Sequence, residues 1–205
     1  MIPLLNNMEY NVDGLIFDVF NIIAGSPLYE KLIEMNIFYF LKSTIDAFRK
    51  RFEELSFIIP KSLSVVAQLL EHFNEEKVAK SFLESEFTNC LEFVFDDVSV
   101  TKNASPFVNL LEVMYENEGL RECLESIDIQ PLLTYIIESE NDDVIIQLQN
   151  FLLKFEENDC STHFLDSLAN AVHDELFEVS LQELTSSTNS EVAARAETLC
   201  SRFYE

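Results

Sequence analysis

The stretch ECLESIDIQPLLTYIIESENDDVIIQLQNFLLKFEE, residues 122–156, determines how the rest of the chain is interpreted. Its apolar residues recur at helical spacing and divide it into a helix, a short turn, a second helix, another turn and a longer helix. Pro131 stands where the first turn of a helix tolerates a missing N–H, and the polar residues 139–142 end one helix and cap the next. The longest helix has an apolar face too broad for one neighbour: Val144, Ile145, Leu148, Phe151, Leu152 and Phe155. We therefore expect neighbouring copies of this unit to cover it.

Degraded copies of this stretch occur elsewhere in the chain. A shift of 48 residues aligns 181–203 with 133–155, and a shift of 92 aligns 32–41 with 124–133. A shift of 42 gives a weaker match at Phe87 and Leu91. If 92 is two units of 46, the repeat period lies in the forties, which is typical of units of two or three helices. The alternative is chance similarity, because apolar helices align with one another by period alone.

The composition favours an all-α protein. The 205 residues are 48% apolar, and they include three glycines and five prolines. So few turn residues argue against an all-β protein, a dinucleotide-binding domain or a glycine-rich phosphate loop. No apolar run is long enough to span a bilayer, and the N-terminal residues lack the basic start of a signal peptide. We expect a cytoplasmic or nuclear protein.

The formal net charge of −24 is distributed unevenly. Residues 1–100 carry 8 basic and 16 acidic side chains, and residues 101–205 carry 5 and 21. Such a field repels nucleic acid and anionic lipid and attracts a basic partner to the C-terminal half. The alternative interpretation is a solvated acidic face that serves solubility alone.

The order of apolar and turn residues predicts helices over 11–24, 28–34, 37–54, 62–73, 75–84, 87–95 and 107–115, followed by helices within 122–156 and 162–203. Breaks are expected at 25–27, at Ile59-Pro60, in the loop 96–105 and at Gly119, and Asn189 or Ser190 is expected to cap the last helix. The predicted organisation is one repeat domain over 1–205, with a partial unit at 1–25 and units at 26–74, 75–117, 118–157 and 158–205.

Two segments resemble the armadillo family of helical repeats. Residues 17–41, FDVFNIIAGSPLYEKLIEMNIFYFL, resemble the junction between the third helix of one armadillo unit and the first two helices of the next. LQNFL at 148–152 is similar to the Leu-x-Asn-Leu core of the third helix. This resemblance implies a right-handed α-solenoid of about four three-helix repeats.

In armadillo proteins, asparagines of the third helices bind the backbone of an extended peptide. The resemblance transfers this role to Asn21 and Asn150, and alignment of the units places Glu71, Val113 and Thr198 at the equivalent points, so the asparagine ladder is interrupted. The chain has no tryptophan, unlike the groove of nuclear-import receptors. We predict a partner-binding set of Asn21, Glu71 and Asn150; the alternative for both asparagines is a capping or solvent-facing role.

The search for catalytic or metal-binding chemistry finds one weak constellation. Cys160 and His163 have the spacing of a partial metal clip, and His173 follows ten residues later. A structural zinc site needs four ligands, and no second cysteine pair lies nearby in the sequence. Cys90, Cys123, Cys160 and Cys200 are widely spaced and are expected to stay reduced. We predict no metal, no cofactor and no catalytic residues.

The favoured function is therefore a non-catalytic scaffold or adaptor that binds a protein segment along the concave face of an acidic α-solenoid. The alternatives in the same class are a phosphatase-type regulatory subunit, an assembly chaperone and an Hsp70 nucleotide-exchange factor. A Cys/His enzyme built on Cys160, His163 and His173 is the alternative of a different class. No nucleic acid or membrane is expected as a partner, and the oligomeric state stays open.

Overall fold

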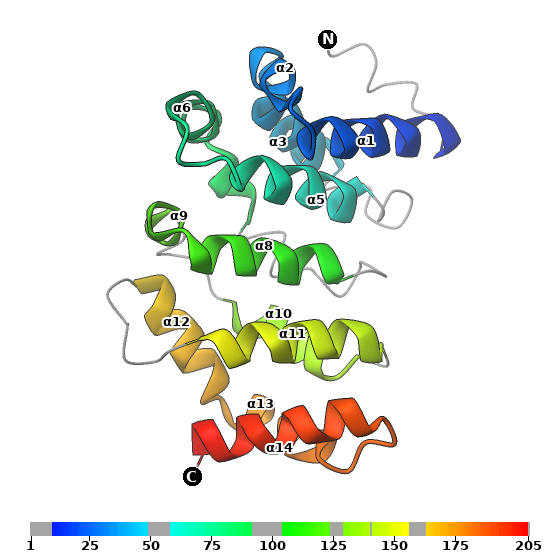
Figure 1. Ribbon diagram of the computed structural model, residues 1–205, viewed down its shortest axis with the longest axis vertical. Helices are drawn as coiled ribbons and strands as arrows, with labels where there is room; N and C mark the ends of the chain where they lie inside the picture. Colours follow the sequence, from blue (N-terminus) through cyan, green and yellow to red (C-terminus); the bar gives the residue numbers. More distant parts are fainter. Residues whose placement is uncertain are drawn as a thin grey trace. The chain divides into compact units, whose positions relative to one another are not determined.

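The computed structural model is entirely helical in the residues that it describes, which are 10–48, 58–91, 104–123, 129–139, 141–155 and 163–204. These ranges contain twelve α-helices, one 3-10 helix and no strand, which confirms the all-α prediction (Figure 1). In chain order the elements are α1 (Tyr10–Ala24), α2 (Tyr29–Glu34), α3 (Ile37–Phe48), α5 (Ile58–Leu70), α6 (Glu76–Ser85), η2 (Phe87–Cys90), α8 (Ser105–Glu116), α9 (Glu118–Glu122), α10 (Gln130–Ile137), α11 (Asp142–Lys154), α12 (His163–Val172), α13 (Glu175–Leu184) and α14 (Ser190–Tyr204).

The chain divides into two compact units. The first unit is Met1–Val94 with Val100–Val113, and the second unit is Phe95–Ser99 with Met114–Glu205. Helices α1 to α6 and η2 belong to the first unit, α9 to α14 belong to the second, and α8 contributes residues to both. The expectation of one repeat array over residues 1–205 stays a prediction.

In the first unit, helices far apart in the sequence lie side by side. Helix α1 packs along α5, and α2 packs on α6, while α3 contacts α5, α6 and η2. The polar contacts between these elements recur at a sequence separation in the forties: Tyr29 Oη donates to Glu75 across 46 residues, and Lys61 donates to the Gly14 carbonyl across 47. The core is rich in fully buried phenylalanines: Phe17, Phe38, Phe82, Phe87 and Phe107.

The second unit repeats this arrangement with other residues. Helix α11 packs along α14, and α10 contacts α11, α12 and α13. The polar contacts again span similar separations: Gln149 Nε2 donates to the Val192 carbonyl across 43 residues, and Asn189 Nδ2 donates to Asp142 across 47. The buried residues of this core are mostly aliphatic and include Leu132, Ile136, Leu148, Leu165, Leu168, Leu181 and Leu199.

Local sequence explains where several helices begin. Asn141 caps α11 by accepting the Val144 N–H, and Asn189 caps α14 by accepting the N–H groups of Glu191 and Val192. Each cap satisfies backbone donors that have no partner within the helix. Pro131 lies in the first turn of α10, where its missing N–H costs nothing. These three assignments confirm the sequence predictions.

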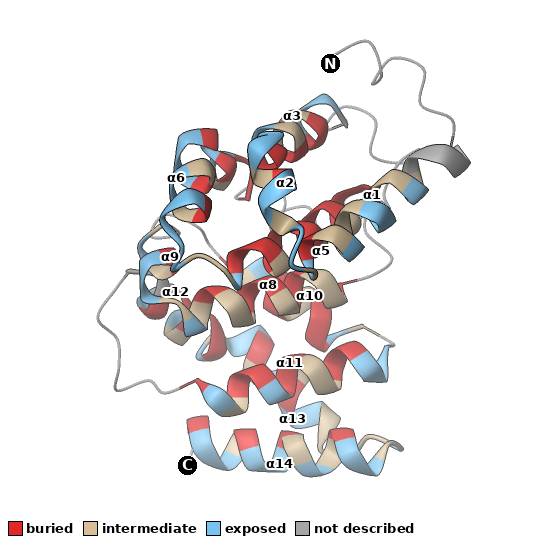
Figure 2. Cartoon of the chain, turned by 45° about the horizontal axis from the view of Figure 1, so that its top comes forward, coloured by how far each residue is buried: buried red, intermediate tan, exposed pale blue. Residues whose placement is uncertain are grey.

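Three sequence predictions about breaks and lengths need correction. Pro60 lies in the first turn of α5 and does not break the chain, because a helix start tolerates proline. Gly119 lies inside the short helix α9 and does not separate two elements. The helix expected over 87–95 begins as a 3-10 helix from Phe87 to Cys90 and is α-helical at Leu91, and its remaining residues fall in 92–103, which together with 49–57 lie outside the described residues. Figure 2 shows how strongly burial differs between elements: α5 is mostly buried, whereas α1 has an exposed edge.

Candidate partner-binding surfaces

Asn21 lies on α1 with its side chain half-buried against the first unit. Its Oδ1 atom is buried and has no hydrogen-bond partner among the described residues, and the same holds for Oε1 of Gln68 on α5. Gln68 lies close to Gly25, where a Cβ atom would come within 3.2 Å of Gln68 Oε1. Buried amide oxygens normally accept a hydrogen bond. The two oxygens without partners are therefore an unusual feature of the contact between α1 and α5.

Glu71 occupies a different position from the one that the alignment of units implies. It follows Leu70, the last residue of α5, and its side chain is exposed. Lys61 contacts Asp18 and Gly14 at separations of 43 and 47 residues. Applied to Asn21, these two separations lead to residues 64 and 68 of α5, both before Glu71. Sequence reasoning missed Gln68, although a period of 47 would have pointed to it.

Asn150 is exposed on α11 and already has a partner within the chain. Its Oδ1 atom accepts a hydrogen bond of 2.8 Å from Arg195 Nε on α14. Arg195 also forms an ion pair of 2.7 Å with Glu191. The structure thus places Asn21 and Glu71 in the first unit and Asn150 in the second, where an arginine engages it.

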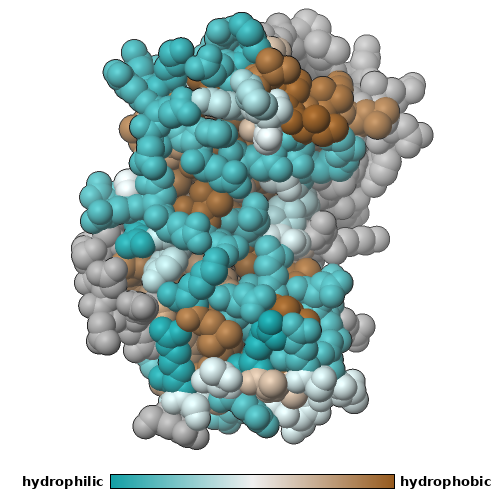
Figure 3. Space-filling model, in the orientation of Figure 1, coloured by the Kyte–Doolittle hydropathy of each residue, from teal (hydrophilic) through white to brown (hydrophobic). Residues whose placement is uncertain are grey.

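Every lysine and arginine of residues 114–205 is used within the chain. Arg121 donates to the Tyr115 carbonyl and lies over the Tyr115 ring, and Lys154 pairs with Glu116 at 3.3 Å. Arg202 donates to the carbonyls of Leu153 and Phe155 at the end of α11. The cations of the second unit therefore neutralise few of its carboxylates. Much of the described surface in Figure 3 is accordingly hydrophilic.

An exposed apolar stripe lies on α1. Leu15, Val19 and Ile22 are spaced as one helical face and are 64%, 51% and 72% exposed. This stripe corresponds to the hydrophobic patch at the position of α1 in Figure 3. The residues 47 positions further along the chain lie on α5 and are all fully buried: Ser62, Val66 and Leu69.

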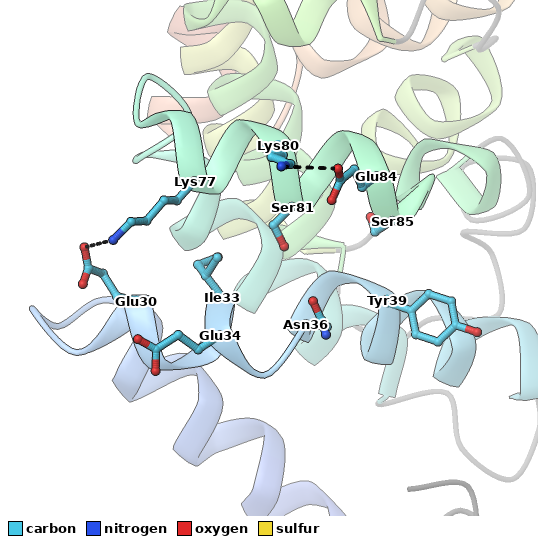
Figure 4. Close-up of a pocket in the computed structure, with 10 residues that line it drawn as sticks. All are labelled: Glu30, Ile33, Glu34, Asn36, Tyr39, Lys77, Lys80, Ser81, Glu84 and Ser85. Atoms are coloured by element: carbon cyan, nitrogen blue, oxygen red, sulfur yellow. Dashed lines mark ion pairs between the residues drawn. The ribbon is translucent and has the colours of Figure 1, made fainter.

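A pocket of about 440 Å³ lies in the first unit between α2, the start of α3 and α6 (Figure 4). Helix α2 contributes Glu30, Ile33 and Glu34 to its wall, and Asn36 and Tyr39 contribute at the corner that leads into α3. The opposite wall is one face of α6, with positions spaced by three and four residues: Lys77, Lys80, Ser81, Glu84 and Ser85.

The polar groups of the pocket are of two kinds. Lys77 pairs with Glu30 at 3.5 Å and Lys80 pairs with Glu84 at 3.8 Å, both in exposed positions. Ser85 is buried and structural, because its hydroxyl donates to the Phe82 carbonyl and accepts the Phe87 N–H. Asn36 and Ser81 point toward one another across the pocket in Figure 4. Asn36 has a left-handed backbone, with φ of 56°, a conformation that asparagine tolerates better than most residues.

Of the three residues of the alternative Cys/His enzyme, only His173 has a described side chain. Cys160 and the side chain of His163 lie outside the described residues, and His173 is exposed with its ring against Phe203 and Tyr204. Burial raises the pKa of the Cys90 thiol to about 12, which keeps it protonated and unreactive. Within the described ranges, no group of three or more His, Cys, Asp or Glu side chains is placed to hold a metal ion.

No protein-family model matches the chain, and no curated protein matches it. None of the described helices has the length and apolar character that crossing a membrane requires.

Proposed function

We propose that this chain is an armadillo-like α-solenoid of about four repeats that serves as a non-catalytic scaffold for a protein partner. One observation carries the proposal: in both units, contacting helices are related by a shift in the forties. Helices α1 and α5 pair across 47 residues at Lys61 and Gly14, and α11 and α14 pair across 45 residues at Asn150 and Arg195. A repeat unit that stacks on its neighbours produces this recurrence.

The burial of α5 also supports stacked repeats. Ten of its thirteen residues are buried, whereas the matching face of α1 exposes an apolar stripe at Leu15, Val19 and Ile22. A helix buried on most of its surface needs neighbours on several sides, as the middle of a repeat array provides. Residues on α1 that have no such neighbour within the described part of the chain keep the apolar character of the repeat.

The charge distribution supports a basic partner. The chain has a net charge of −24, and the lysine and arginine side chains of residues 114–205 are engaged in contacts within the chain. Exposed carboxylates attract a cationic segment over several ångströms and raise its rate of association. An extended array offers a long surface for such a segment and needs no deep reactive pocket.

Small-angle X-ray scattering tests the architecture directly. A closed globule of this length has a radius of gyration of about 17 Å. We expect a clearly larger value and an asymmetric distance distribution, because stacked units extend in one direction. A value near that of a globule would contradict the solenoid.

The partner class is tested by capturing proteins from lysate with the intact chain and with a charge-reversed variant. We expect Glu183→Lys with Glu197→Lys, on exposed positions of α13 and α14, to lose the basic proteins that the wild type retains. The matched control is Asp46→Lys on α3 with Glu76→Lys on α6, two exposed positions of the first unit outside the pocket. Raised salt should release the partners, since screening acts within about 10 Å at 0.1 M. Equal retention by both variants and at high salt would contradict an acidic binding surface.

A further inference from the structure

The outward side of α13 carries an apolar pair that the core of the second unit does not use. Leu176 and Val179 lie about one helical turn apart and are 63% and 48% exposed. The opposite side of the helix attaches α13 to the unit, because Phe177 and Leu181 are fully buried. The exposed pair is therefore available to a partner.

Glutamates surround this apolar pair. Glu175 lies one turn before Val179 and Glu183 lies one turn after it, and both glutamate side chains are exposed. Beside them, Ser180 donates a hydrogen bond of 3.2 Å to Glu138 of α10, which brings a third carboxylate to the same side of the unit. We call the apolar pair and these three glutamates the α13 face.

The negative charge of the α13 face is not compensated within the described part of the chain. Glu175 and Glu183 form no ion pair there, and the hydroxyl that Glu138 accepts carries no charge. The four lysine and arginine side chains of residues 114–205 lie on α9, α11 and α14, and each has a contact elsewhere within the chain. An approaching cation therefore meets carboxylates that no lysine or arginine has neutralised.

The exposed stripe on α1 provides a comparison within the same molecule. Leu15 and Val19 are the same residue types at similar exposure, 64% and 51%. Asp18, the carboxylate between them in the sequence, pairs with Lys61 at 2.5 Å. Clustered apolar side chains mark an interaction surface, and the charge around them selects the partner. The α13 face therefore favours a segment with positive charge beside its apolar residues, whereas the α1 stripe does not.

The backbone of α13 limits how such a segment can bind. An extended segment binds best by adding to the edge of a sheet, but the N–H and C=O groups of α13 are used within the helix. Recognition therefore depends on side chains that recur every three or four residues, a spacing that a second helix also presents. Glu175 and Glu183 are eight positions apart, about 12 Å along the helix axis, which suits basic side chains on either side of an apolar pair.

We propose that the α13 face binds an amphipathic α-helix of a basic protein partner. Apolar residues of that helix, three or four positions apart, lie against Leu176 and Val179. Lysine or arginine side chains about one turn before and after them pair with Glu175 and Glu183. The proposal rests on the proposed function in taking a basic protein as the partner, and it adds the surface and the helical form of the bound segment.

The direct test is a two-dimensional ¹H–¹⁵N NMR titration of the full chain with a capped alanine-based peptide of about 18 residues, which is long enough to form a helix. The peptide carries two leucines three positions apart, with lysines one turn before and one turn after them. We expect saturable shifts of the backbone amides of Leu176, Val179 and Glu183. Raised salt should weaken the binding several-fold, because it screens the charge pairs.

Three matched peptides separate the contributions to binding. The peptide with glutamate in place of lysine should show no saturable binding, because its charge has the same sign as that of the α13 face. The peptide with alanine in place of leucine keeps the charge and should bind at least tenfold more weakly. The peptide with a central proline keeps the leucines and lysines but breaks the helix, and it should also bind at least tenfold more weakly.

A first pair of variants tests the apolar contact. Leu176→Gln with Val179→Gln removes the apolar pair and keeps every charge, and it should weaken binding of the leucine–lysine peptide at least tenfold. Leu15→Gln with Val19→Gln makes the same change on α1 and should alter binding less than twofold. All four side chains are exposed, so both variants should keep the circular dichroism of the wild type.

A second pair of variants tests the charge. Glu175→Gln with Glu183→Gln removes two carboxylates of the α13 face and should weaken binding at least tenfold. Asp46→Asn with Glu76→Gln removes the same charge from exposed positions of the first unit and should alter binding less than twofold.

Several results would overturn the assignment. Equal binding of the alanine peptide would show charge attraction alone, and equal binding of the proline peptide would exclude a helical ligand. Equal losses in a variant and its control would show that the peptide does not select the α13 face. Self-association of the chain that Leu176→Gln with Val179→Gln abolishes would assign the face to a second copy.

The proposed function can fail or stand separately from this face. If the peptide does not bind while Glu183→Lys with Glu197→Lys still loses the basic proteins of the lysate, the acidic scaffold stands and the α13 face fails as a helix site. If the peptide binds at the α13 face while scattering shows a closed globule, the face stands and the solenoid fails.

Discussion

In the first unit, Phe82 of α6 holds distant elements together through rings, with centroids 5.2 Å from Phe38, 6.1 Å from Phe73 and 6.1 Å from Phe87. In the second unit, arginines contribute hydrogen bonds between α11 and α14. Arg195 donates to Asn150, and Arg202 donates to the carbonyls at the end of α11. Both units pair helices at a similar sequence separation, and each combines rings with polar contacts: the first unit adds Lys61 to Asp18, and the second adds the Tyr115 ring against Phe151 and Phe155. The residues that do so differ between the units.

Under the proposed repeat architecture, this difference in residues explains why the copies are degraded in sequence. The shift between paired helices is fixed by the lengths of the helices and turns, whereas the side chains at the contact need only be complementary. A ring cluster and an arginine that spans two helices both meet that requirement. The period therefore persists where the residues themselves no longer align.

The largest expected effect is on the ring cluster of the first unit. Phe82→Ala removes a side chain that is 1% exposed and touches three other rings, and it should lower the free energy of unfolding by about 3–5 kcal/mol. Urea unfolding followed by circular dichroism measures this loss. Leu83→Ala, one residue later on the same helix and 55% exposed, is the matched control and should stay within about 0.5 kcal/mol. A similar loss in both variants would mean that the ring cluster does not stabilise the unit.

A smaller effect is expected where the second unit relies on arginine. Arg202→Ala removes the hydrogen bonds to the Leu153 and Phe155 carbonyls and should cost about 1–2 kcal/mol, since charged hydrogen bonds are strong but one of these is solvent-exposed and the other only partly buried. Arg202→Lys keeps the charge and loses the planar fork, so its stability should lie between those of Arg202→Ala and the wild type. If the Arg202→Lys variant is as stable as the wild type, a positive charge near the end of α11 is sufficient for the stabilisation. The urea midpoint of each variant decides between these outcomes.

The smallest stability changes concern Gln68 and Gln149, whose Oε1 atoms are both buried without a partner among the described residues. Gln68→Met in the first unit removes such an atom, and it should raise stability by up to about 1 kcal/mol. Gln149→Met in the second unit removes such an atom and also the donor to the Val192 carbonyl, so the two effects offset one another and stability should fall by less than about 1 kcal/mol. A loss of stability in Gln68→Met would indicate that this oxygen has a partner, such as a bound water.

A pH titration tests the hydrogen bond between Tyr29 of α2 and Glu75, which directly precedes α6. The hydrogen bond that Tyr29 donates to Glu75 raises the pKa of the Tyr29 phenol to about 12. Because the folded pKa lies above the ordinary value, the contact contributes fully below about pH 10 and is lost as the pH rises through about 12. We expect ¹³C NMR of the tyrosine ζ carbons to show this ring ionising late, and Glu75→Gln to return its pKa toward the ordinary value. Tyr29→Phe assigns the signal.

The helices and their caps could be predicted because they depend on local patterns. Apolar spacing located α1, α6 and α11, and Asn141 and Asn189 cap helices as expected. The breaks at Pro60 and Gly119 failed because both residues are tolerated in the first turn of a helix, which a residue count alone does not reveal.

The candidate site was less accessible to sequence reasoning. Placing Glu71 opposite Asn21 implies a shift of 50, whereas the contacts of Lys61 span 47 and 43 residues. Successive values differ by about one helical turn, so they keep the same residues on the apolar face and the pattern does not distinguish them. The pocket between α2 and α6 carries no motif, because its polar residues come from helices that meet only in the folded chain.

The contacts that the lysine and arginine side chains of the second unit make within the chain affect how susceptible this unit is to different proteases. Trypsin cleaves after lysine and arginine, and residues 114–205 offer it only Arg121, Lys154, Arg195 and Arg202. Each of these side chains is bound within the chain. Trypsin should therefore leave this region largely uncut under native conditions, whereas a protease that cleaves after glutamate has many targets there. Paired digestion with the two enzymes would give a simple assay of whether the second unit is folded.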